Sequence, residues 1–256
     1  MKIAISDFDG TLCRIAPGTN LGGRVPEENV VAIRRWREAG NKFGIASGRG
    51  LSFLVPEVEK YGIPVDFLIC GNGSSVFDGE RNRLHRTVIP TEVLEAFARH
   101  PLSTPEDRPF LVFGERQLYS VRPYPHIPVE VAPLISIEEA VKREDVVQLG
   151  LMFPTPEETR QASDEMERDF PMLGGNPNRV YLDINMNQVN KRYGVERLLE
   201  VMGWEGNEVF VIGDDRNDLP MIRHFHGFTV NTAQPFVKEA ATRIYDSVGN
   251  MLNENL

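Results

Sequence analysis

The hydrophobic positions of this chain fall into short apolar runs separated by longer amphipathic segments. After the first run, Val30, Ile33 and Trp36 recur at helical spacing until Gly40 ends the pattern. Short buried strands that alternate with helices are typical of a parallel sheet with helices on both faces. We therefore expect strands at residues 3–5, 42–46 and 66–70 and helices at residues 26–39 and 51–61.

The pattern changes between about Val76 and Asn185. Apolar stretches there are interrupted by turn residues around Gly79 and Gly114, which predicts two hairpins. Further strands are expected at residues 146–153 and 179–184, and a helix at residues 156–170. Hairpins next to a single helix are typical of an α+β insert rather than of a continued parallel sheet.

The alternation of strand and helix returns after residue 190. We expect helices at residues 191–202 and 218–224 and strands at residues 208–212, 228–230 and 243–245. The predicted fold class is therefore α/β, with a parallel-sheet core interrupted by an inserted α+β domain. We assign residues 1–83 and 185–256 to the core and residues 84–184 to the insert.

The composition of the chain limits the kinds of molecule that it is expected to bind and the compartment in which it is expected to work. The 256 residues carry 28 Lys and Arg against 37 Asp and Glu, a formal net charge of −9, which argues against a general nucleic-acid binder. No apolar run is long enough to cross a bilayer, and the N-terminus lacks the apolar core of a signal peptide. Cys13 and Cys70 form no CxxC pair, so we expect small buried thiols and a cytoplasmic protein.

Polar clusters follow three of the predicted parallel strands. In an open α/β sheet, ligands bind outside the carboxyl ends of the strands. Three clusters at that edge therefore predict a binding site there. The clusters are Ser6–Thr11, Ser47–Arg49 and Gly213–Asp218.

These clusters contain the groups that a phosphoryl site requires. Asp7, Asp9 and Asp214 offer hard oxygen ligands, which favour Mg²⁺ over zinc in the absence of His or Cys. Lys191, at the start of a predicted helix, and the hydroxyl of Ser47 offer a cation and a donor for phosphoryl oxygens.

The spacing of the first two aspartates suits covalent catalysis. A carboxylate is able to attack phosphorus to form an aspartyl-phosphate, and a second carboxylate two residues later is able to donate a proton to the leaving alkoxide and then take one from water. Asp7 and Asp9 supply such a pair. Gly10 permits a tight turn after the strand, and we expect the Thr11 hydroxyl to cap that turn.

The four motifs, in this order, resemble those of haloacid dehalogenase superfamily phosphatases. The long insert between the second and third motifs is similar to that of the Cof-type sugar-phosphatase branch, whose class IIB cap lies there. The matching residues are Asp7–Leu12, Ser47–Arg49, Lys191 and Gly213–Asp218. The resemblance implies a Rossmann-like core with an inserted α+β cap that selects the substrate.

The resemblance also implies roles for single residues. Asp7 would be the nucleophile and Asp9 the general acid/base. Mg²⁺ would be bound by the side chains of Asp7 and Asp214 and by the backbone carbonyl of Asp9, with Asp218 acting behind these ligands. The residues expected to hold the phosphoryl group or the substrate are Ser47, Gly48, Arg49, Asn72, Lys191 and Asn217.

Two other interpretations of the motifs fail on their spacing. Counted from Asp214, the third position is Arg216 and the sixth is Leu219, so this segment is not an EF-hand calcium loop. The segment Gly71–Val76 lacks the third glycine of a dinucleotide-binding loop. We expect it instead to face the substrate, with Asn72 near the phosphoryl group.

The sequence therefore predicts a Mg²⁺-dependent phosphatase that hydrolyses small phosphorylated metabolites, sugar phosphates in particular, through an aspartyl-phosphate. Two alternatives stay open. One is a phosphotransferase similar to phosphomannomutases on the same site, and the other is a non-catalytic protein that binds phosphorylated metabolites. We expect a monomer or a small homo-oligomer, with no nucleic-acid or membrane partner.

Overall fold

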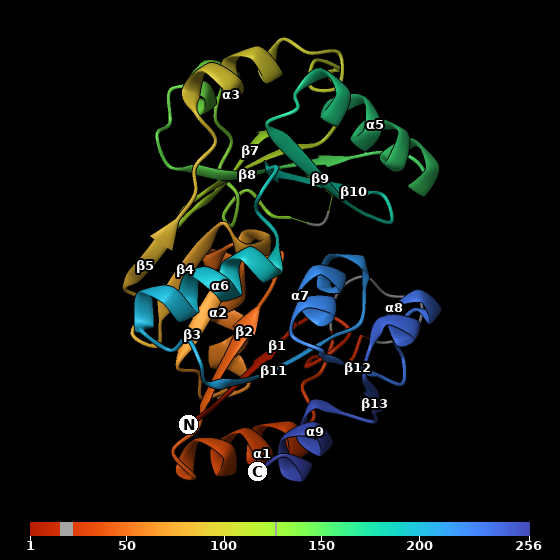
Figure 1. Cartoon of the computed structure of the whole chain (residues 1–256). Coiled ribbons are helices and arrows are strands. Elements are labelled where there is room, and N and C mark those ends of the chain that lie inside the picture. Colours follow the sequence, from red (N-terminus) through yellow and green to blue (C-terminus); the bar gives the residue numbers. More distant parts are fainter. Residues whose placement is uncertain (16–22, 126) are drawn as a thin grey trace. The chain divides into compact units, whose positions relative to one another are not determined.

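The computed structural model describes residues 1–15, 23–125 and 127–256, which fold into two compact units (Figure 1). The core unit comprises Met1–Ser47, Leu54–His85 and Asn190–Leu256. The inserted unit comprises Gly48–Phe53 and Arg86–Val189. The predicted α/β fold class is confirmed, because helices alternate with the strands of a largely parallel sheet in the core unit.

An eight-stranded sheet forms the centre of the core unit, in the order β13-β12-β11-β1-β2-β3-β4-β5. The pairs from β13 through to β3 are parallel, and β4 runs antiparallel to β3. The central strands are almost fully buried, as expected for a parallel sheet covered on both faces. The strands are β1 (Lys2–Ser6), β2 (Lys42–Ala46), β3 (Phe67–Cys70), β4 (Ser75–Asp78), β5 (Arg83–Arg86), β11 (Glu208–Gly213), β12 (Phe228–Val230) and β13 (Arg243–Tyr245).

The hairpin β4–β5 corrects one expectation. Its residues read as the start of the insert, yet both strands extend the sheet of the core unit. The free edge of β3 needs hydrogen-bond partners, and β4 supplies them while burying Val76 and Phe77. Strand β5 also runs across the boundary drawn between residues 83 and 84.

Helices pack on the core sheet through apolar stripes. Helix α1 buries Ile33 and Trp36, and the Trp36 indole donates to the carbonyl of Lys42 at 2.8 Å. Helix α9 packs against α1, where the Gly249 amide donates to Asn29 Oδ1 at 2.8 Å. The helices are α1 (Glu27–Glu38), α2 (Leu51–Lys60), α6 (Lys191–Met202), α7 (Leu219–His224), α8 (Pro235–Ala240) and α9 (Val248–Glu254), with 3₁₀ turns at Gly71–Gly73 and Arg216–Asp218. Of these, α8 and α9 had not been expected.

The inserted unit contains a five-stranded antiparallel sheet in the order β7-β6-β8-β10-β9. Its apolar core joins the sheet to helices, with Phe97 and Met166 packed in the same cluster as Leu151 and Ile184. The elements are β6 (Phe110–Gly114), β7 (Leu118–Arg122), β8 (Val146–Met152), β9 (Leu173–Asn178), β10 (Tyr181–Met186), α3 (Thr91–Ala98), α4 (Ile137–Val141) and α5 (Pro156–Asp169). The strands β6, β7, β8 and β10 and the helix α5 follow the predicted pattern, whereas α3, α4 and β9 had not been expected.

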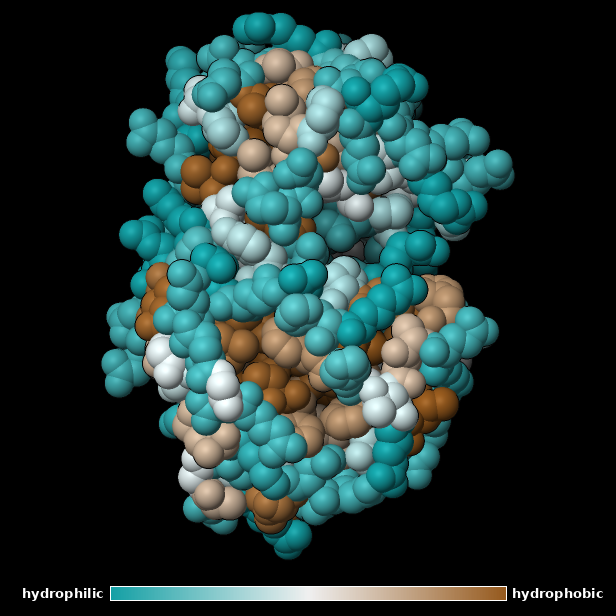
Figure 2. All heavy atoms as spheres, in the orientation of Figure 1, coloured by the Kyte–Doolittle hydropathy of each residue, from teal (hydrophilic) through white to brown (hydrophobic). Residues whose placement is uncertain are grey.

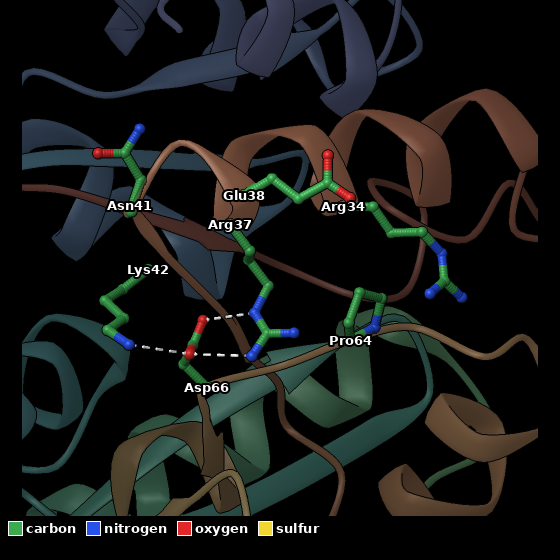
Figure 3. Close-up of a pocket in the computed structure, with 8 residues that line it drawn as sticks. Arg34, Arg37, Glu38, Asn41, Lys42, Pro64 and Asp66 are labelled. Carbon is green, nitrogen blue, oxygen red and sulfur yellow. Dashed lines mark hydrogen bonds and ion pairs between the residues drawn. The ribbon is translucent and has the colours of Figure 1, made fainter.

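A surface pocket of about 380 Å³ lies where α1, β2 and the segment before β3 meet (Figure 3). The Asp66 carboxylate accepts from Arg37 Nε at 2.8 Å, Arg37 Nη2 at 3.1 Å, Lys42 Nζ at 3.2 Å and the Phe43 amide at 3.0 Å. Burial would raise the pKa of Asp66, but the hydrogen bonds from Arg37 and Phe43 outweigh it and lower the pKa. The Asp66 carboxylate is therefore paired with Arg37 and Lys42, and it ties three elements of the fold together.

Replacing Asp66 with alanine is expected to lower the free energy of unfolding by about 2–3 kcal/mol, because four donors lose a charged acceptor. Folding lowers the pKa of Asp66. Its contribution to the free energy of unfolding is therefore fully present above the unfolded pKa of 3.8 and is lost as the pH falls through the pKa of the folded state. Urea titrations near neutral pH and at acid pH measure the difference. Alanine at Asp107, which is exposed, is the matched control, and an equal effect of both substitutions would contradict this role.

On the face shown in Figure 2, most residues are hydrophilic, with smaller groups of hydrophobic residues between them. Among the described residues, no helix is both long enough and apolar enough to span a bilayer.

Candidate active site

The predicted polar clusters follow strands that lie side by side, in the order β11-β1-β2-β3 (Figure 1). The ladder continues one residue beyond the strands. The amide of Asp7 donates to Ile212 at 2.9 Å, and that of Ser47 donates to Ile69 at 2.9 Å. The amide of Asn72 in turn donates to the carbonyl of Ser47 at 3.0 Å. The backbone of this edge is therefore held by the sheet itself.

Lys191 reaches this edge from the first turn of α6. Asn190 caps that helix by accepting from the Tyr193 amide at 3.0 Å. The helix start approaches the Gly71–Gly73 turn closely, since a Cβ on Gly73 would lie 2.2 Å from the Asn190 carbonyl oxygen. The fully buried ammonium of Lys191 donates to Asp7 Oδ1 at 2.5 Å and to Asp218 Oδ1 at 2.6 Å.

The carboxylate of Asp218 is fully engaged by the protein. One oxygen accepts from Lys191, and the other accepts from the amides of Asp214 and Asp215 at 2.9 and 3.1 Å. A Cβ on Gly213 would lie 2.2 Å from the Asp218 carboxyl carbon, so only glycine fits there. Asp218 therefore holds Lys191 and the loop after β11 in one arrangement.

Asp214 is positioned by the loop after β1. The Thr11 hydroxyl donates to Asp214 Oδ1 at 2.6 Å, across 203 residues of sequence. Gly10 has φ +92°, and a Cβ there would lie 2.3 Å from Asp214 Oδ2. The sequence suggested only a turn-capping role for Thr11, and nothing in the local pattern pointed to this long-range contact.

Negative charge exceeds positive charge at this cluster. Asp7, Asp214 and Asp218 bring carboxylate oxygens within 4.8 Å of one another, with one ammonium among them. Burial raises the pKa of Asp7 well above its usual value even though Lys191 lowers it, and burial with the charge of Asp218 raises the pKa of Asp214 to about 7. Burial would lower the pKa of Lys191, but Asp218 and Asp7 outweigh it and raise that pKa. A cation that prefers oxygen ligands fits this donor set.

The fold and these residues agree with a comparison of the whole chain. Residues 4–250 match the sequence profile of the haloacid dehalogenase-like hydrolases. The chain belongs to this family. This confirms the resemblance found in the sequence. It also confirms the prediction that the chain is an enzyme of this family.

Relatives of this haloacid dehalogenase-like hydrolase cover nearly its full length. Two Bacillus subtilis proteins named 5-amino-6-(5-phospho-D-ribitylamino)uracil phosphatase are similar to it: YcsE is 23% identical over 96% of this chain and 90% of its own length. YwtE is 22% identical over 96% of this chain and 93% of its own length. The structure of the HAD subclass IIB sugar phosphatase BT4131 superposes with a TM-score of 0.81 at 23% identity, over 100% and 99% of the two chains. A haloacid dehalogenase-like hydrolase from B. subtilis superposes with a TM-score of 0.83 at 19% identity, over the full length of both.

The other residues expected in the site differ in their burial and in the unit to which they belong. Asp9 is half-buried, and its charge is one of the contributions that raise the pKa of Asp7. Asn217 Nδ2 donates to the side-chain oxygen of the buried Asn72 at 3.0 Å, which joins the loops after β3 and β11. Ser47 is buried in the core unit. Gly48 and Arg49, in contrast, group with the inserted unit.

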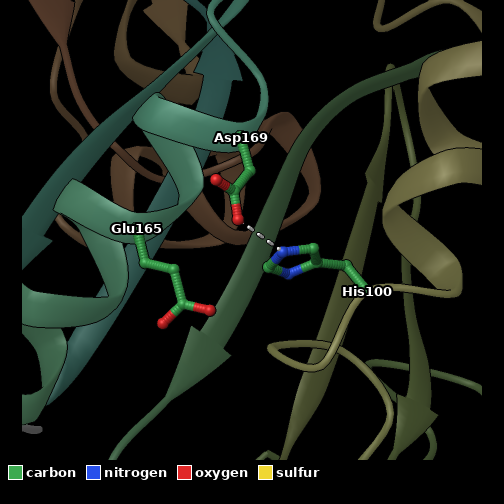
Figure 4. A group of neighbouring side chains, drawn as sticks. All are labelled: His100, Glu165 and Asp169. Atoms are coloured by element: carbon green, nitrogen blue, oxygen red, sulfur yellow. Dashed lines mark hydrogen bonds and ion pairs between the residues drawn. The ribbon is translucent and has the colours of Figure 1, made fainter.

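A second group of potential metal ligands lies in the inserted unit, at His100, Glu165 and Asp169 (Figure 4). His100 Nδ1 accepts from the Leu102 amide at 3.3 Å, which leaves the ring proton on Nε2. That nitrogen lies 3.2 Å from Asp169 Oδ2, and Arg168 also pairs with Asp169. His100 and Asp169 are therefore joined by a hydrogen bond, and the ion pair of Asp169 at the end of α5 is with Arg168.

Proposed function

We propose that this hydrolase is a Mg²⁺-dependent phosphatase of small phosphorylated metabolites, sugar phosphates in particular. The observation that carries the proposal is the buried cluster of Asp7, Asp214 and Asp218 around Lys191, at the carboxyl edge of the core sheet. The names of the relatives support the choice of substrate class, because they include phosphatases of a phosphoribityl compound and of sugars.

The metal would be held by the side chains of Asp7 and Asp214 and by the backbone carbonyl of Asp9. Asp218 would stay outside the ligand set, because both of its oxygens already accept hydrogen bonds. When bound, Mg²⁺ supplies positive charge that offsets the repulsion between a carboxylate nucleophile and the phosphoryl oxygens.

The chemistry would proceed in two balanced steps. A carboxylate oxygen of Asp7 forms a bond to phosphorus while the bond from phosphorus to the alkoxide breaks, and Asp9 gives that alkoxide its proton. Water then attacks phosphorus, the bond to Asp7 breaks, and Asp9 takes the proton from that water. Lys191 and Ser47 would balance the charge of the phosphoryl oxygens in both steps.

The insert, residues 84–184, would act as a cap that selects the substrate and keeps bulk water out until the phosphoryl group has moved to Asp7. We place the enzyme in the cytoplasm, as a monomer or small homo-oligomer. Cys13 and Cys70 support that location because both are free thiols rather than partners in a disulfide.

Metal binding is expected to remove a pH dependence of stability. The pKa of Asp214 rises from 3.8 to about 7 on folding, so its contribution to stability is fully present below the unfolded value and is lost as the pH rises through 7. In EDTA, the free energy of unfolding should therefore fall as the pH rises from 3.8 to about 7 and level off above that. Mg²⁺ should reduce that fall, since a cation replaces the proton.

Urea titrations with EDTA or Mg²⁺ measure this effect. The matched control is Asp214→Asn, in which the difference between the two conditions should largely disappear. A wild-type chain whose stability has the same pH dependence with and without Mg²⁺ would contradict the metal assignment.

The activity itself is tested with a panel of phosphorylated metabolites. We expect release of inorganic phosphate from at least one sugar phosphate with Mg²⁺ and none with EDTA. Transfer of the phosphoryl group to a second sugar, without free phosphate, would identify a phosphotransferase instead. Folded protein that releases and transfers no phosphate from any member of the panel would overturn the proposal.

A further inference from the structure

The turn that follows β2 is fixed by hydrogen bonds on two successive carbonyls. The Ser47 carbonyl accepts from the Asn72 amide at 3.0 Å, within the core unit. The next carbonyl, that of Gly48, accepts from the side-chain Nε2 of Gln148 at 3.2 Å, within the inserted unit. The chain therefore passes between the two units at the peptide that joins Ser47 to Gly48.

Gln148 is an unusual residue for its position. It lies in β8, in the apolar run Val146–Met152, and its side chain is fully buried. Burying an amide is costly unless each of its polar atoms is paired, so an apolar residue would be the simpler choice for the strand. Its hydrogen bonds therefore explain this side chain better than packing alone does.

The orientation of the Gln148 amide is set by its neighbour on β10. Asn185 Nδ2 donates to Gln148 Oε1 at 3.3 Å and to the Val147 carbonyl at 3.1 Å. Asn185 is itself fully buried. With its oxygen accepting from Asn185, Gln148 presents its NH₂ group to Gly48.

Holding the Gly48 carbonyl also orients the next amide. The described residues contain no cis peptide, so the Gly48 C=O and the Arg49 N–H point in opposite directions from one peptide plane. Glycine has the least restricted backbone of all residues, and this plane would rotate easily without a partner. Gln148 thereby fixes the direction of the Arg49 N–H, two residues after Ser47. Backbone N–H groups in such turns are effective donors to phosphate oxygens.

We propose that Gln148 is a positioning residue for phosphoryl binding, acting through the peptide between Gly48 and Arg49. The inference rests on the proposed function, in which Ser47 at the start of this turn balances the charge of the phosphoryl oxygens. It places a determinant of phosphate affinity in a strand of the inserted unit, a hundred residues from the turn that it orients.

The test compares Gln148→Met, which keeps the length of the side chain but removes the donor, with the wild-type chain. The probe is inorganic phosphate, titrated calorimetrically in the presence of Mg²⁺, and kcat/KM is measured for a phosphate ester that the wild type hydrolyses. We expect the Kd for phosphate to rise and kcat/KM to fall by at least about tenfold, less than the loss on removing a direct oxyanion donor. Mg²⁺ affinity should be unchanged, because Asp7 and Asp214 belong to the core unit.

The matched control is Gln117→Met, which removes two side-chain donations to carbonyls elsewhere in the inserted unit. It should leave phosphate affinity unchanged, so equal losses in both variants would show a merely structural effect and overturn the inference. Gln148→Leu is the second variant should the first fail to fold. Wild-type phosphate affinity and kcat/KM in a folded Gln148 variant would also overturn it. Failure of the proposed function would give a different result from failure of this inference. The wild-type chain would then release no phosphate, whereas phosphate binding by the wild type and the variant could still be compared.

Discussion

Replacing Asp7 with asparagine is expected to lower kcat by at least about a thousandfold while the chain stays folded. The substitution removes the proposed nucleophile but keeps the shape of a side chain that is 5% exposed. It also reduces the excess of negative charge, so we expect no large loss of stability. Phosphate release and urea titration of the same preparation measure the two effects.

Asp164→Asn is the matched control, because it makes the same chemical change at an exposed position on α5. It should retain wild-type turnover. Turnover by Asp7→Asn within tenfold of the wild type would exclude Asp7 as the nucleophile.

Replacing Lys191 with methionine is expected to affect stability as well as activity. The fully buried ammonium pairs with Asp7 at 2.5 Å and with Asp218 at 2.6 Å, and its removal leaves two buried carboxylates without their cation. Breaking a buried ion pair on one side costs about 3–5 kcal/mol. We therefore expect the free energy of unfolding in EDTA to fall by about this amount, and Mg²⁺ to restore part of it.

The loss caused by Lys191→Met should shrink as the pH falls. Burial already raises the pKa of Asp7, and removing Lys191 raises it further, so a proton replaces the missing cation at lower pH. Lys142→Met, at an exposed position after α4, is the control and should have little effect. A loss of stability that is no larger at alkaline than at acid pH would contradict this account of the cluster.

The location of the site was predictable because the residues that form it follow buried strands. Asp7, Ser47 and Asp214 each come directly after a buried strand, and the carboxyl ends of parallel strands share one edge of a sheet. Lys191 was recognisable from its place at a helix start after the insert.

The contacts within the site were not predictable, because they join residues far apart in the sequence. The hydrogen bond from Thr11 to Asp214 and the ion pair from Lys191 to Asp218 depend on how the loops meet once the sheet is formed. The same holds for Gln148, whose amide finds Gly48 a hundred residues away.

The elements that were missed lack a clear periodic signal. Strand β9 has the sequence LGGNPN, whose glycines and proline disfavour a strand, and it occurs at an edge of its sheet where proline is tolerated. Helices α4 and α8 are five and six residues long, too short for a helical repeat to show. The hairpin β4–β5 was recognised as a hairpin, but its sequence does not reveal which sheet it joins.

The central claim is that Asp7 carries the phosphoryl group during turnover. The most direct measurement is an acid-quenched reaction with a hydrolysed phosphate ester and Mg²⁺, followed by borohydride reduction, which converts an aspartyl-phosphate to homoserine, and by mass spectrometry of the peptides. The account predicts that the modification appears at Asp7 and is missing when the substrate is left out. Steady turnover with no modification at Asp7, or with modification at another carboxylate, would contradict it.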